Sequence, residues 1–395
     1  MNLLDKFDAH RQRQRELDLV DADPANVVIE RMYSATEAEI NGRRTILAGT
    51  NNYLGLTFEE ACISAGQQAL AALGTGTTGS RMANGNYRLH EQLERDLAEF
   101  YDCPHAMVFS TGYSANLGTL TALLEPGDCV MLDADAHASL YDGCRMTGAE
   151  VYRFRHNDPD SLEKRLRRLG ARSTRTLVVT EGLFSVLGDR APLAEIAAVT
   201  RRHGAYLFVD EAHSLGIYGA RGRGVAEEAG VLDEVDFVVG TFSKSLGGTG
   251  GYCASRHDVV GLFRFASRPY IFTASPCPSV VATTRAALRL VRERPEIRER
   301  LWRNARTLHG GLEALDLVLG APVSPVVAVR FEEKDRAVAI WRRLLDNGIY
   351  CNLMMPPASP DGSSLLRLSA SAGHTPEQII AVIDGFRRAL AATGG

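Results

Sequence analysis

The sequence predicts an α/β fold, in which helices cover both faces of a mostly parallel sheet, followed by a smaller α+β domain. From about residue 60, short apolar runs alternate with helix-like stretches, which is the pattern of a buried parallel sheet. After about residue 285 the pattern changes to long charged helices with few strands between them. Because 395 residues are too many for one ordinary core, we expect two packed domains.

Three segments are expected along the chain. Asn41-Gly42 separates two β-like runs and is the strongest short signal for a β-hairpin, so it places a hairpin near the N-terminus. The expected segments are an N-terminal helix and β-hairpin at 1–58, a large cofactor-binding domain at 59–285 and a small α+β domain at 286–395.

The elements of both domains follow in order. The large domain has expected strands at 106–109, 129–132, 176–180, 206–210 and 237–240, with helices at 61–73, 87–101, 115–124 and 192–204. The small domain has a charged helix at 289–315, interrupted at Pro295, strands at 326–331 and 365–369, and a final helix at 376–390. In such sheets, functional groups gather at the carboxyl ends of the strands.

Composition narrows the functional class. The net charge of -4 argues against a nucleic-acid or anionic-membrane partner. No apolar run reaches the roughly 18 residues of a membrane span, and charges from Asp5 onward interrupt any signal peptide, so we expect a cytoplasmic protein. Leu3, Leu4 and Phe7 fit the apolar stripe of a short docking helix better than a membrane anchor. The seven cysteines include no C-x-x-C pair, which predicts neither a metal site nor disulfides.

Lys244 is the first candidate catalytic residue. It follows the expected strand 237–240 by four residues and lies among hydroxyls and glycines, which suits a lysine that forms a Schiff base. Thr241 and Ser243 can donate hydrogen bonds to a phosphate. The alternative is a solvated loop lysine, and for an isolated motif that alternative would be preferred. It is less favoured here because matching groups lie upstream in order.

Asp210 ends another expected strand, about thirty residues before Lys244. A carboxylate in this place can keep a pyridine nitrogen protonated, so that the ring withdraws electrons from a carbanion. His213 follows closely and would lie near the ring hydroxyl. The alternative is a helix-capping aspartate with a histidine in the core.

Four further residues are candidates with open alternatives. Gly112 and Tyr113 follow a strand and open a helix, so their N–H groups favour an anion such as phosphate; a plain turn is the alternative. His137 could stack on a cofactor ring or merely flank a helix cap. Arg367, on an apolar strand, could bind a substrate carboxylate or form a structural salt bridge.

The residues also resemble a known family, the fold-type I pyridoxal 5′-phosphate (PLP) enzymes of the α-oxoamine synthase group. The segments similar to that group are TNNYLGL (50–56), GTTGSR (76–81), STGYSANLG (110–118), DADAHASLYDG (133–143), EGLFSVLGD (181–189), DEAHSLG (210–216) and GTFSKSLGG (240–248). Those similar to its branch of soluble bacterial serine palmitoyltransferases are RFRHN (153–157), RPYIFTAS (268–275), LWRNARTLHGGL (301–312) and HTPEQI (374–379).

The resemblance implies a seven-stranded sheet and a role for each candidate. Lys244 resembles the lysine that holds PLP and moves protons, and Asp210 the partner of the pyridine nitrogen. His137 resembles the stacking residue, which also touches the substrate carboxylate. The remaining implied roles are ring-hydroxyl neighbours for Ser185 and His213, phosphate ligands for Gly112, Tyr113, Thr241 and Ser243, a phosphate ligand from the other subunit of a homodimer for Thr273, a substrate neighbour for Asn52 and the carboxylate ligand for Arg367.

The implied reaction is a decarboxylative condensation of L-serine with a long-chain acyl-CoA. Three alternatives stay open at this stage. A related synthase could use glycine or alanine, a PLP enzyme could act without acyl-CoA as an aminotransferase or lyase, or the chain could be an inactive partner subunit. The presence of Lys244 disfavours the last.

Overall fold

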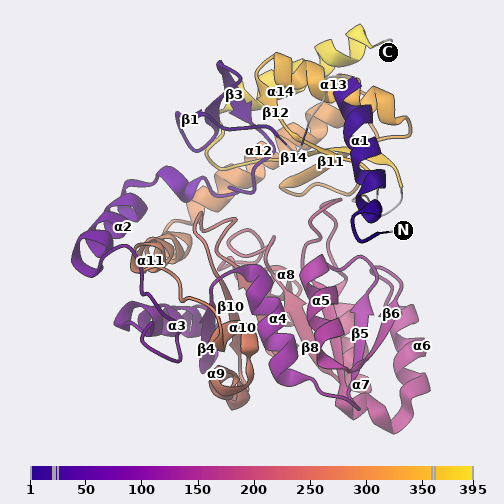
Figure 1. The fold of residues 1–395 in the computed structure, drawn as a ribbon. Coiled ribbons are helices and arrows are strands. Elements are labelled where there is room, and N and C mark those ends of the chain that lie inside the picture. Colours follow the sequence, from indigo (N-terminus) through magenta and orange to yellow (C-terminus); the bar gives the residue numbers. More distant parts are fainter. Residues whose placement is uncertain (1, 20–23, 25, 357–358, 360–361, 394–395) are drawn as a thin grey trace. The chain divides into compact units, whose positions relative to one another are not determined.

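The computed structural model describes residues 2–19, 24, 26–356, 359 and 362–393 (Figure 1). Contacts divide the chain into two compact units, which we call the larger and the smaller unit. The larger unit comprises Asn51–Arg303 and Ser371–Gly373, and the smaller comprises Met1–Thr50, Asn304–Ala370 and His374–Gly395. The division into three segments along the chain, with boundaries at residues 58 and 285, stays a prediction.

The larger unit is built on a seven-stranded sheet with the order β4-β10-β9-β8-β7-β5-β6. All its strands run parallel except β10, which is antiparallel to both β4 and β9. The strands are β4 (His105–Phe109), β5 (Cys129–Asp133), β6 (Glu150–Phe154), β7 (Thr176–Glu181), β8 (Tyr206–Asp210), β9 (Phe237–Thr241) and β10 (Gly251–Ser255). The five strands expected from the sequence are confirmed, and β6 and β10 are additions.

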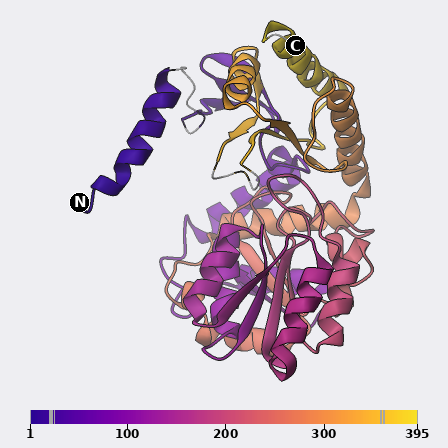
Figure 2. The same ribbon diagram turned by 90° about the vertical axis from the view of Figure 1, so that its right-hand side faces the viewer.

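Helices lie on both faces of this sheet (Figure 2), which explains why its central strands are mostly apolar. Every residue of β5, β7 and β9 is buried. The helices of the larger unit are α2 (Glu60–Leu73), α3 (Arg88–Phe100), α4 (Gly112–Leu123), α5 (Ala138–Thr147), α6 (Pro159–Leu169), α7 (Leu193–Arg202), α8 (Val225–Glu228), α9 (Phe263–Ala266), α10 (Arg268–Ile271) and α11 (Pro278–Glu293). Leu120 of α4 and Leu140 of α5 join Val130, Val179 and Phe208 of the sheet in one apolar core.

The long charged helix is interrupted where the sequence predicts. α11 ends at Glu293, and α12 (Pro295–Glu313) begins with the proline, whose ring tolerates only the first turn of a helix. α12 contains the boundary between the two units, which falls between Arg303 and Asn304.

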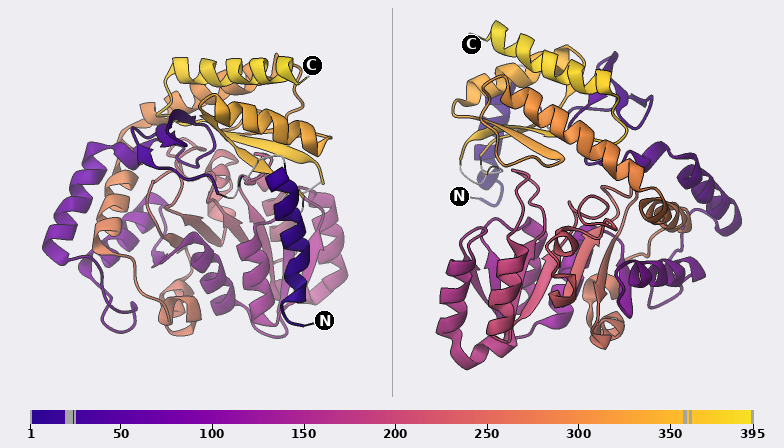
Figure 3. Two further views of the ribbon diagram at one scale, coloured as in Figure 1. Left: turned by 45° about the horizontal axis from the view of Figure 1, so that its top comes forward. Right: turned by 180° about the vertical axis from the view of Figure 1, so that it is seen from behind.

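The described residues of the smaller unit form two sheets. One has the order β1-β2-β3-β12 and the other β11-β14-β13. Asn41 and Gly42 join β2 and β3 with φ angles of 53° and 67°, so the predicted hairpin turn is confirmed. α13 packs against the three-stranded sheet, and α14 packs beside α13 (Figure 3).

The elements of the smaller unit are α1 (Asp8–Leu19), β1 (Arg31–Met32), β2 (Glu37–Ile40), β3 (Arg43–Leu47), β11 (Val326–Phe331), α13 (Lys334–Asp346), β12 (Ile349–Tyr350), β13 (Asn352–Met354), β14 (Ser364–Ser369) and α14 (Pro376–Ala392). Leu3 and Leu4 precede α1 and are exposed, as is Phe7. Among the described residues, no helix is both long and apolar enough to cross a bilayer.

Candidate active site

A cavity of about 310 Å³ opens at the carboxyl ends of β7, β8 and β9, between the starts of α4 and α5. It is lined by Thr111, Gly112, Tyr113, Asn116, His137, Ser139, Glu181, Asp210, Ala212, His213, Gly240, Thr241, Ser243, Lys244, Thr249 and Gly250. A larger hollow of about 890 Å³ lies among α2, α3 and α11, but alanine, leucine and arginine side chains dominate its lining. The smaller cavity is the candidate site because acid, base and anion-binding groups converge there.

Eight of the twelve predicted site residues meet in this cavity. They are Gly112, Tyr113, His137, Asp210, His213, Thr241, Ser243 and Lys244. The structure also describes Ser185, Asn52 and Thr273, but these residues do not line the cavity. Arg367 belongs to the smaller unit. The role of each individual residue stays a prediction.

Asp210 is held as a buried carboxylate at the end of β8. Its Oδ2 accepts a hydrogen bond of 2.7 Å from Asn116 Nδ2, and its Oδ1 accepts one of 2.9 Å from the Ala212 N–H. Only 4% of the residue is exposed. These two contacts fix the direction of the carboxylate, so it is oriented to receive a cationic N–H group from a ligand.

His137 caps the N-terminus of α5 and faces the cavity with part of its ring accessible. Its Nδ1 lies 2.7 Å from Ser139 Oγ and accepts from the Ser139 N–H at 3.2 Å. Asn116 Nδ2 donates to the same Ser139 hydroxyl at 2.9 Å, which directs the hydroxyl proton toward His137. The neutral ring then carries its own proton on Nε2. Surrounding protein lowers the pKa of His137, Lys244 lowers it further and Asp210 opposes both.

Glu181 is a cavity residue that the sequence reasoning missed. It ends β7 directly beside Asp210 of β8, and only 2% of it is exposed. Its Oε1 accepts a 2.6 Å hydrogen bond from the His137 N–H. Burial and then the neighbouring Asp210 raise the pKa of Glu181 well above its ordinary value. Its position at the end of an apolar run was the signal that could have identified it.

A further part of the cavity lining, at the start of α4 and the loop after β9, is suited to an anion. Gly112 and Tyr113 form the first turn of α4, where N–H groups have no intrahelical acceptor. A Cβ added at Gly112 would lie 2.6 Å from Thr241 Cβ, so only glycine allows the helix to approach β9 this closely. The hydroxyls of Thr241 and Ser243 lie 2.9 Å apart on the adjoining loop.

Lys244 lies on the loop between β9 and β10 and is half-buried. The loop is closed by hydrogen bonds from the Phe242 N–H to the Gly250 carbonyl at 3.0 Å and from the Gly247 N–H to the Lys244 carbonyl at 3.0 Å. Gly247 has a φ of 62°, which this turn requires. The amine therefore comes from a folded turn at the end of a buried strand.

The remaining predicted residues lie in defined places outside the cavity lining. Ser185 is half-buried on the loop that follows β7. Asn52 donates from Nδ2 to Thr57 Oγ1 at 2.8 Å. Thr273 follows α10, beside the exposed Phe272. Arg367 is 5% exposed on β14 and donates to Ser369 Oγ at 2.9 Å.

These features fit PLP. The oriented, buried carboxylate of Asp210 suits its ring nitrogen, and a helix N-terminus with two hydroxyls suits its phosphate. Gly112 lets the first turn of α4 lie against Thr241, because a larger residue would overlap the Thr241 side chain. Lys244 supplies the amine that such a cofactor needs.

Comparisons with known proteins agree with this geometry. The family model described as aminotransferase class I and II matches residues 44–386. The serine palmitoyltransferase of Caulobacter vibrioides is 54% identical, with 100% of this chain and 98% of the relative covered. An 8-amino-7-oxononanoate synthase of Lysinibacillus sphaericus is 34% identical, with 95% of this chain and 97% of the relative covered.

A solved structure described as serine palmitoyltransferase with PLP superimposes with a TM-score of 0.97 at 50% identity, covering 100% of both chains. The predicted fold type and cofactor are thereby confirmed. The chain belongs to the class I and II aminotransferase family of PLP-dependent enzymes and, within it, to the group that contains the bacterial serine palmitoyltransferases.

Proposed function

We propose that the protein is an enzyme that condenses L-serine with a long-chain acyl-CoA such as palmitoyl-CoA, giving 3-oxosphinganine, CoA and CO₂. The reaction class rests on one observation, the meeting of Lys244, Asp210 and His137 in one cavity. The choice of serine and a long acyl chain rests on the likeness to serine palmitoyltransferases over the whole chain, which exceeds the likeness to 8-amino-7-oxononanoate synthase.

The cofactor is PLP, and different cavity residues bind its ring nitrogen, its aldehyde carbon and its phosphate. When bound, PLP supplies an electron sink for negative charge at the substrate α-carbon. Asp210 holds the proton of the ring nitrogen, and Lys244 is the residue to which the cofactor is attached. Gly112 and Tyr113 N–H groups, with the Thr241 and Ser243 hydroxyls, hold the phosphate.

Lys244 moves the proton of the substrate α-carbon during the reaction. The Lys244 amine removes the α-proton of serine, and the carbon that loses it forms a bond to the acyl carbonyl carbon. The C–S bond of the thioester breaks, and the CoA thiolate leaves and takes up a proton. The bond between the α-carbon and the carboxylate breaks next, CO₂ departs, and Lys244 returns a proton to the α-carbon.

The order of these steps depends on how the carboxylate is held. The His137 Nε2–H is the donor available to a substrate carboxylate in the cavity, because Nδ1 already faces Ser139. Arg367 is the second predicted ligand of that carboxylate. A carboxylate that is hydrogen-bonded until the new C–C bond exists is retained through the first half of the reaction, which places loss of CO₂ after condensation.

We also propose that the enzyme is a homodimer that works in the cytoplasm, where its acyl-CoA substrate is found. Thr273 lies outside the cavity lining of its own chain, on a segment with an exposed apolar surface. Phe272, Phe265 and Leu262 are 73%, 67% and 62% exposed there. A second subunit that covers these side chains would place Thr273 beside the partner's phosphate site.

A parallel assay tests the substrate. The purified enzyme with PLP is given palmitoyl-CoA and serine, alanine or glycine, CoA release is followed with a thiol reagent, and products are identified by mass spectrometry. Release that favours serine at least tenfold, with 3-oxosphinganine formed, supports the proposal. Release that favours glycine or alanine assigns the chain to another branch, and no release with any amino acid contradicts acyl-CoA condensation.

A further inference from the structure

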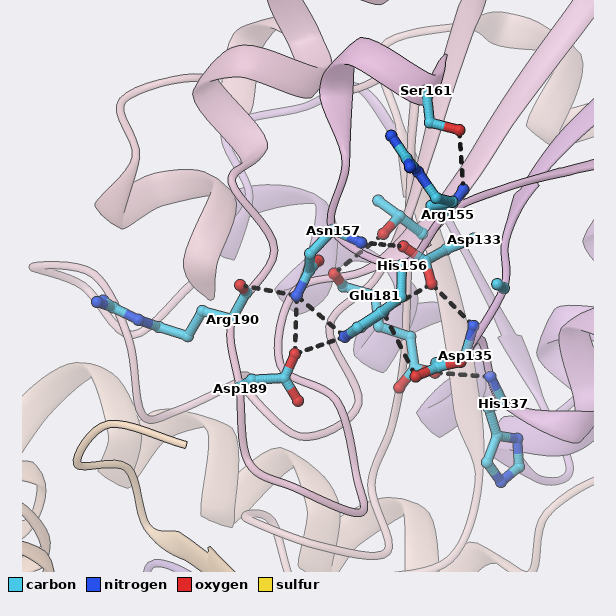
Figure 4. Close-up of polar contacts among 12 residues, drawn as sticks. Asp133, Asp135, His137, Arg155, His156, Asn157, Ser161, Glu181, Asp189 and Arg190 are labelled. Atoms are coloured by element: carbon cyan, nitrogen blue, oxygen red, sulfur yellow. Dashed lines mark hydrogen bonds and ion pairs between the residues drawn. The ribbon is translucent and has the colours of Figure 1, made fainter. Parts of the chain in front are cut away.

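A second group of charged side chains surrounds His156, beside the cavity (Figure 4). His156 lies in the turn between β6 and α6, and 24% of its side chain is exposed. Its Nδ1 is 2.8 Å from Asp133 Oδ1, and its Nε2 is 2.7 Å from Asp189 Oδ2. The cavity does not include any of these three residues.

The two contacts require a protonated ring. A neutral imidazole has one N–H group and can donate to only one carboxylate, whereas an imidazolium donates to both. Burial lowers the pKa of His156, but hydrogen bonds to Asp133 and Asp189 outweigh burial and raise the pKa to about 10. Asp135 adds a third carboxylate 3.9 Å from Nδ1, so the ring is surrounded by negative charge.

Asp133 connects His156 to the turn that holds His137. It ends β5 with a fully buried side chain, and its Oδ1 also accepts from the Asp135 N–H at 2.9 Å. Its Oδ2 accepts from the Asn157 N–H at 3.0 Å. The short turn that begins at Asp133 therefore takes its shape from a carboxylate that His156 holds in place.

Asp189 connects His156 to the loop that contains Ser185. The loop is closed by hydrogen bonds from the Phe184 N–H to the Asp189 carbonyl at 2.9 Å and from the Ala191 N–H to the Gly182 carbonyl at 3.1 Å. The Asn157 side chain donates to Asp189 Oδ2 at 2.7 Å. The edge-on ring of Phe184, 4.4 Å from the His156 ring, packs the base of the same loop against the histidine.

We propose that His156 is a positioning residue, an imidazolium that ties the turn of His137 to the loop of Ser185 and so fixes both side chains around the bound cofactor. The role of His137 in this inference rests on the proposed function, and that of Ser185 rests on the place beside the ring hydroxyl that the family resemblance implies. His156 itself touches neither substrate nor cofactor. It acts through two carboxylates, each of which holds one loop, so the loss of either link releases one loop from the other.

Two substitutions separate the two links. In His156→Asn the side-chain amide stands in for Nδ1 and can still reach Asp133, and in His156→Gln it stands in for Nε2 and can still reach Asp189. Both variants lose the charge and one link. The matched control is His203→Gln, because His203 is also half-buried and pairs through Nε2 with one carboxylate, Glu163, at 2.8 Å.

The readouts are kcat, the KM for serine, and the visible circular dichroism of bound PLP, which depends on the surroundings of the cofactor and needs no turnover. Both His156 variants should lower kcat by about 10- to 100-fold and change the dichroism per bound PLP, as expected for misplaced active-site groups. His203→Gln should stay within about twofold of the wild type in both readouts.

Retention of wild-type kcat and dichroism by either His156 variant overturns the inference. If the wild type condenses none of the amino acids but the variants still change the dichroism, the proposed function fails and the positioning role stands. Should the His156 variants not fold, Asp189→Asn gives the same test through one link, with a smaller loss expected in both readouts.

Histidine side-chain ¹⁵N NMR of the holoenzyme at about pH 8 gives an independent check, since a neutral His156 contradicts the inference.

Discussion

Two histidines that follow neighbouring strands of one sheet have their pKa values shifted in opposite directions. His137, after β5, borders the cavity, where surrounding protein and the nearby Lys244 lower its pKa. His156, after β6, lies between Asp133 and Asp189, which raise its pKa to about 10 against the effect of burial. At neutral pH the same side chain is thus a neutral hydrogen-bond donor at one place and a cation at the other.

The difference shows that the neighbours of a buried ring decide its role. At the cavity, Asp210 is engaged by Asn116 and Ala212, and neither of its oxygens bonds to His137. Around His156, one carboxylate oxygen meets each ring nitrogen. We infer that the cavity keeps groups able to exchange protons, whereas the neighbouring cluster holds the loops in shape.

The largest effect should come from the amine of the cavity. Lys244→Ala removes the group that moves the α-proton, and we expect turnover to fall by at least about a thousandfold. Lys244→Arg, which keeps a cation but cannot serve as the base, should lose nearly as much. The measurement is CoA release with serine and palmitoyl-CoA, and near-full activity of Lys244→Ala would contradict the assignment of the catalytic lysine.

Asp210→Asn should give the next largest loss. The amide keeps the shape but lacks the charge that holds a proton on the ring nitrogen, so kcat should fall by about 100-fold. The matched control is Asp236→Asn at the opposite end of the sheet, where a buried carboxylate pairs with Arg256 and His257, both at 2.8 Å. If both variants lose the same kcat per folded molecule, the loss comes from removing any buried carboxylate charge and not from the position of Asp210 in the cavity.

His156 predicts a dependence of stability on pH. Because its folded pKa of about 10 exceeds the unfolded value, its contribution is fully present below about pH 6.5 and is lost as pH rises through 10. From about pH 7 to about pH 9, the free energy of unfolding of the wild type should fall relative to His156→Gln by about 1 kcal/mol per pH unit. The free energies are measured by urea unfolding at each pH. If those of the wild type and His156→Gln change with pH in parallel, the ring of His156 is neutral.

The smallest effect should come from Glu181. Its pKa is raised mainly by burial, whereas burial lowers the pKa of His156. The raised folded pKa of Glu181 means that the unfolded chain releases a proton above about pH 4.5 that the folded chain keeps, so this residue costs stability as pH rises. Glu181→Gln should therefore be more stable than the wild type at pH 8, and the difference should shrink at pH 5. A variant that is less stable at pH 8 would indicate an ionised Glu181.

The sequence predicted the central strands because each is a short, mostly apolar run with turn residues after it. It missed β6 because Glu150 and Arg153 interrupt the apolar pattern at an edge of the sheet. It also missed β10, where the residues other than Tyr252 are small and resemble a loop. Strands of these two kinds are defined by their hydrogen-bonded neighbours rather than by their own composition.

The sequence also predicted most of the cavity, because strand ends can be identified locally. It did not predict Asn116, which holds Asp210 across 94 positions, or the 44-position link from His137 to Glu181. Such pairs depend on which strands become neighbours in the sheet. His156 was visible only as part of RFRHN, and its two carboxylate partners lie 23 and 33 positions away.

The most direct test of the account is to find which lysine holds the cofactor. The holoenzyme is reduced with sodium borohydride, which fixes PLP covalently to its lysine, and the digested protein is analysed by mass spectrometry. The account predicts that the added mass lies on the peptide that contains Lys244. Added mass on Lys6, Lys164 or Lys334, the other lysines of the sequence, or on no peptide at all, would contradict it.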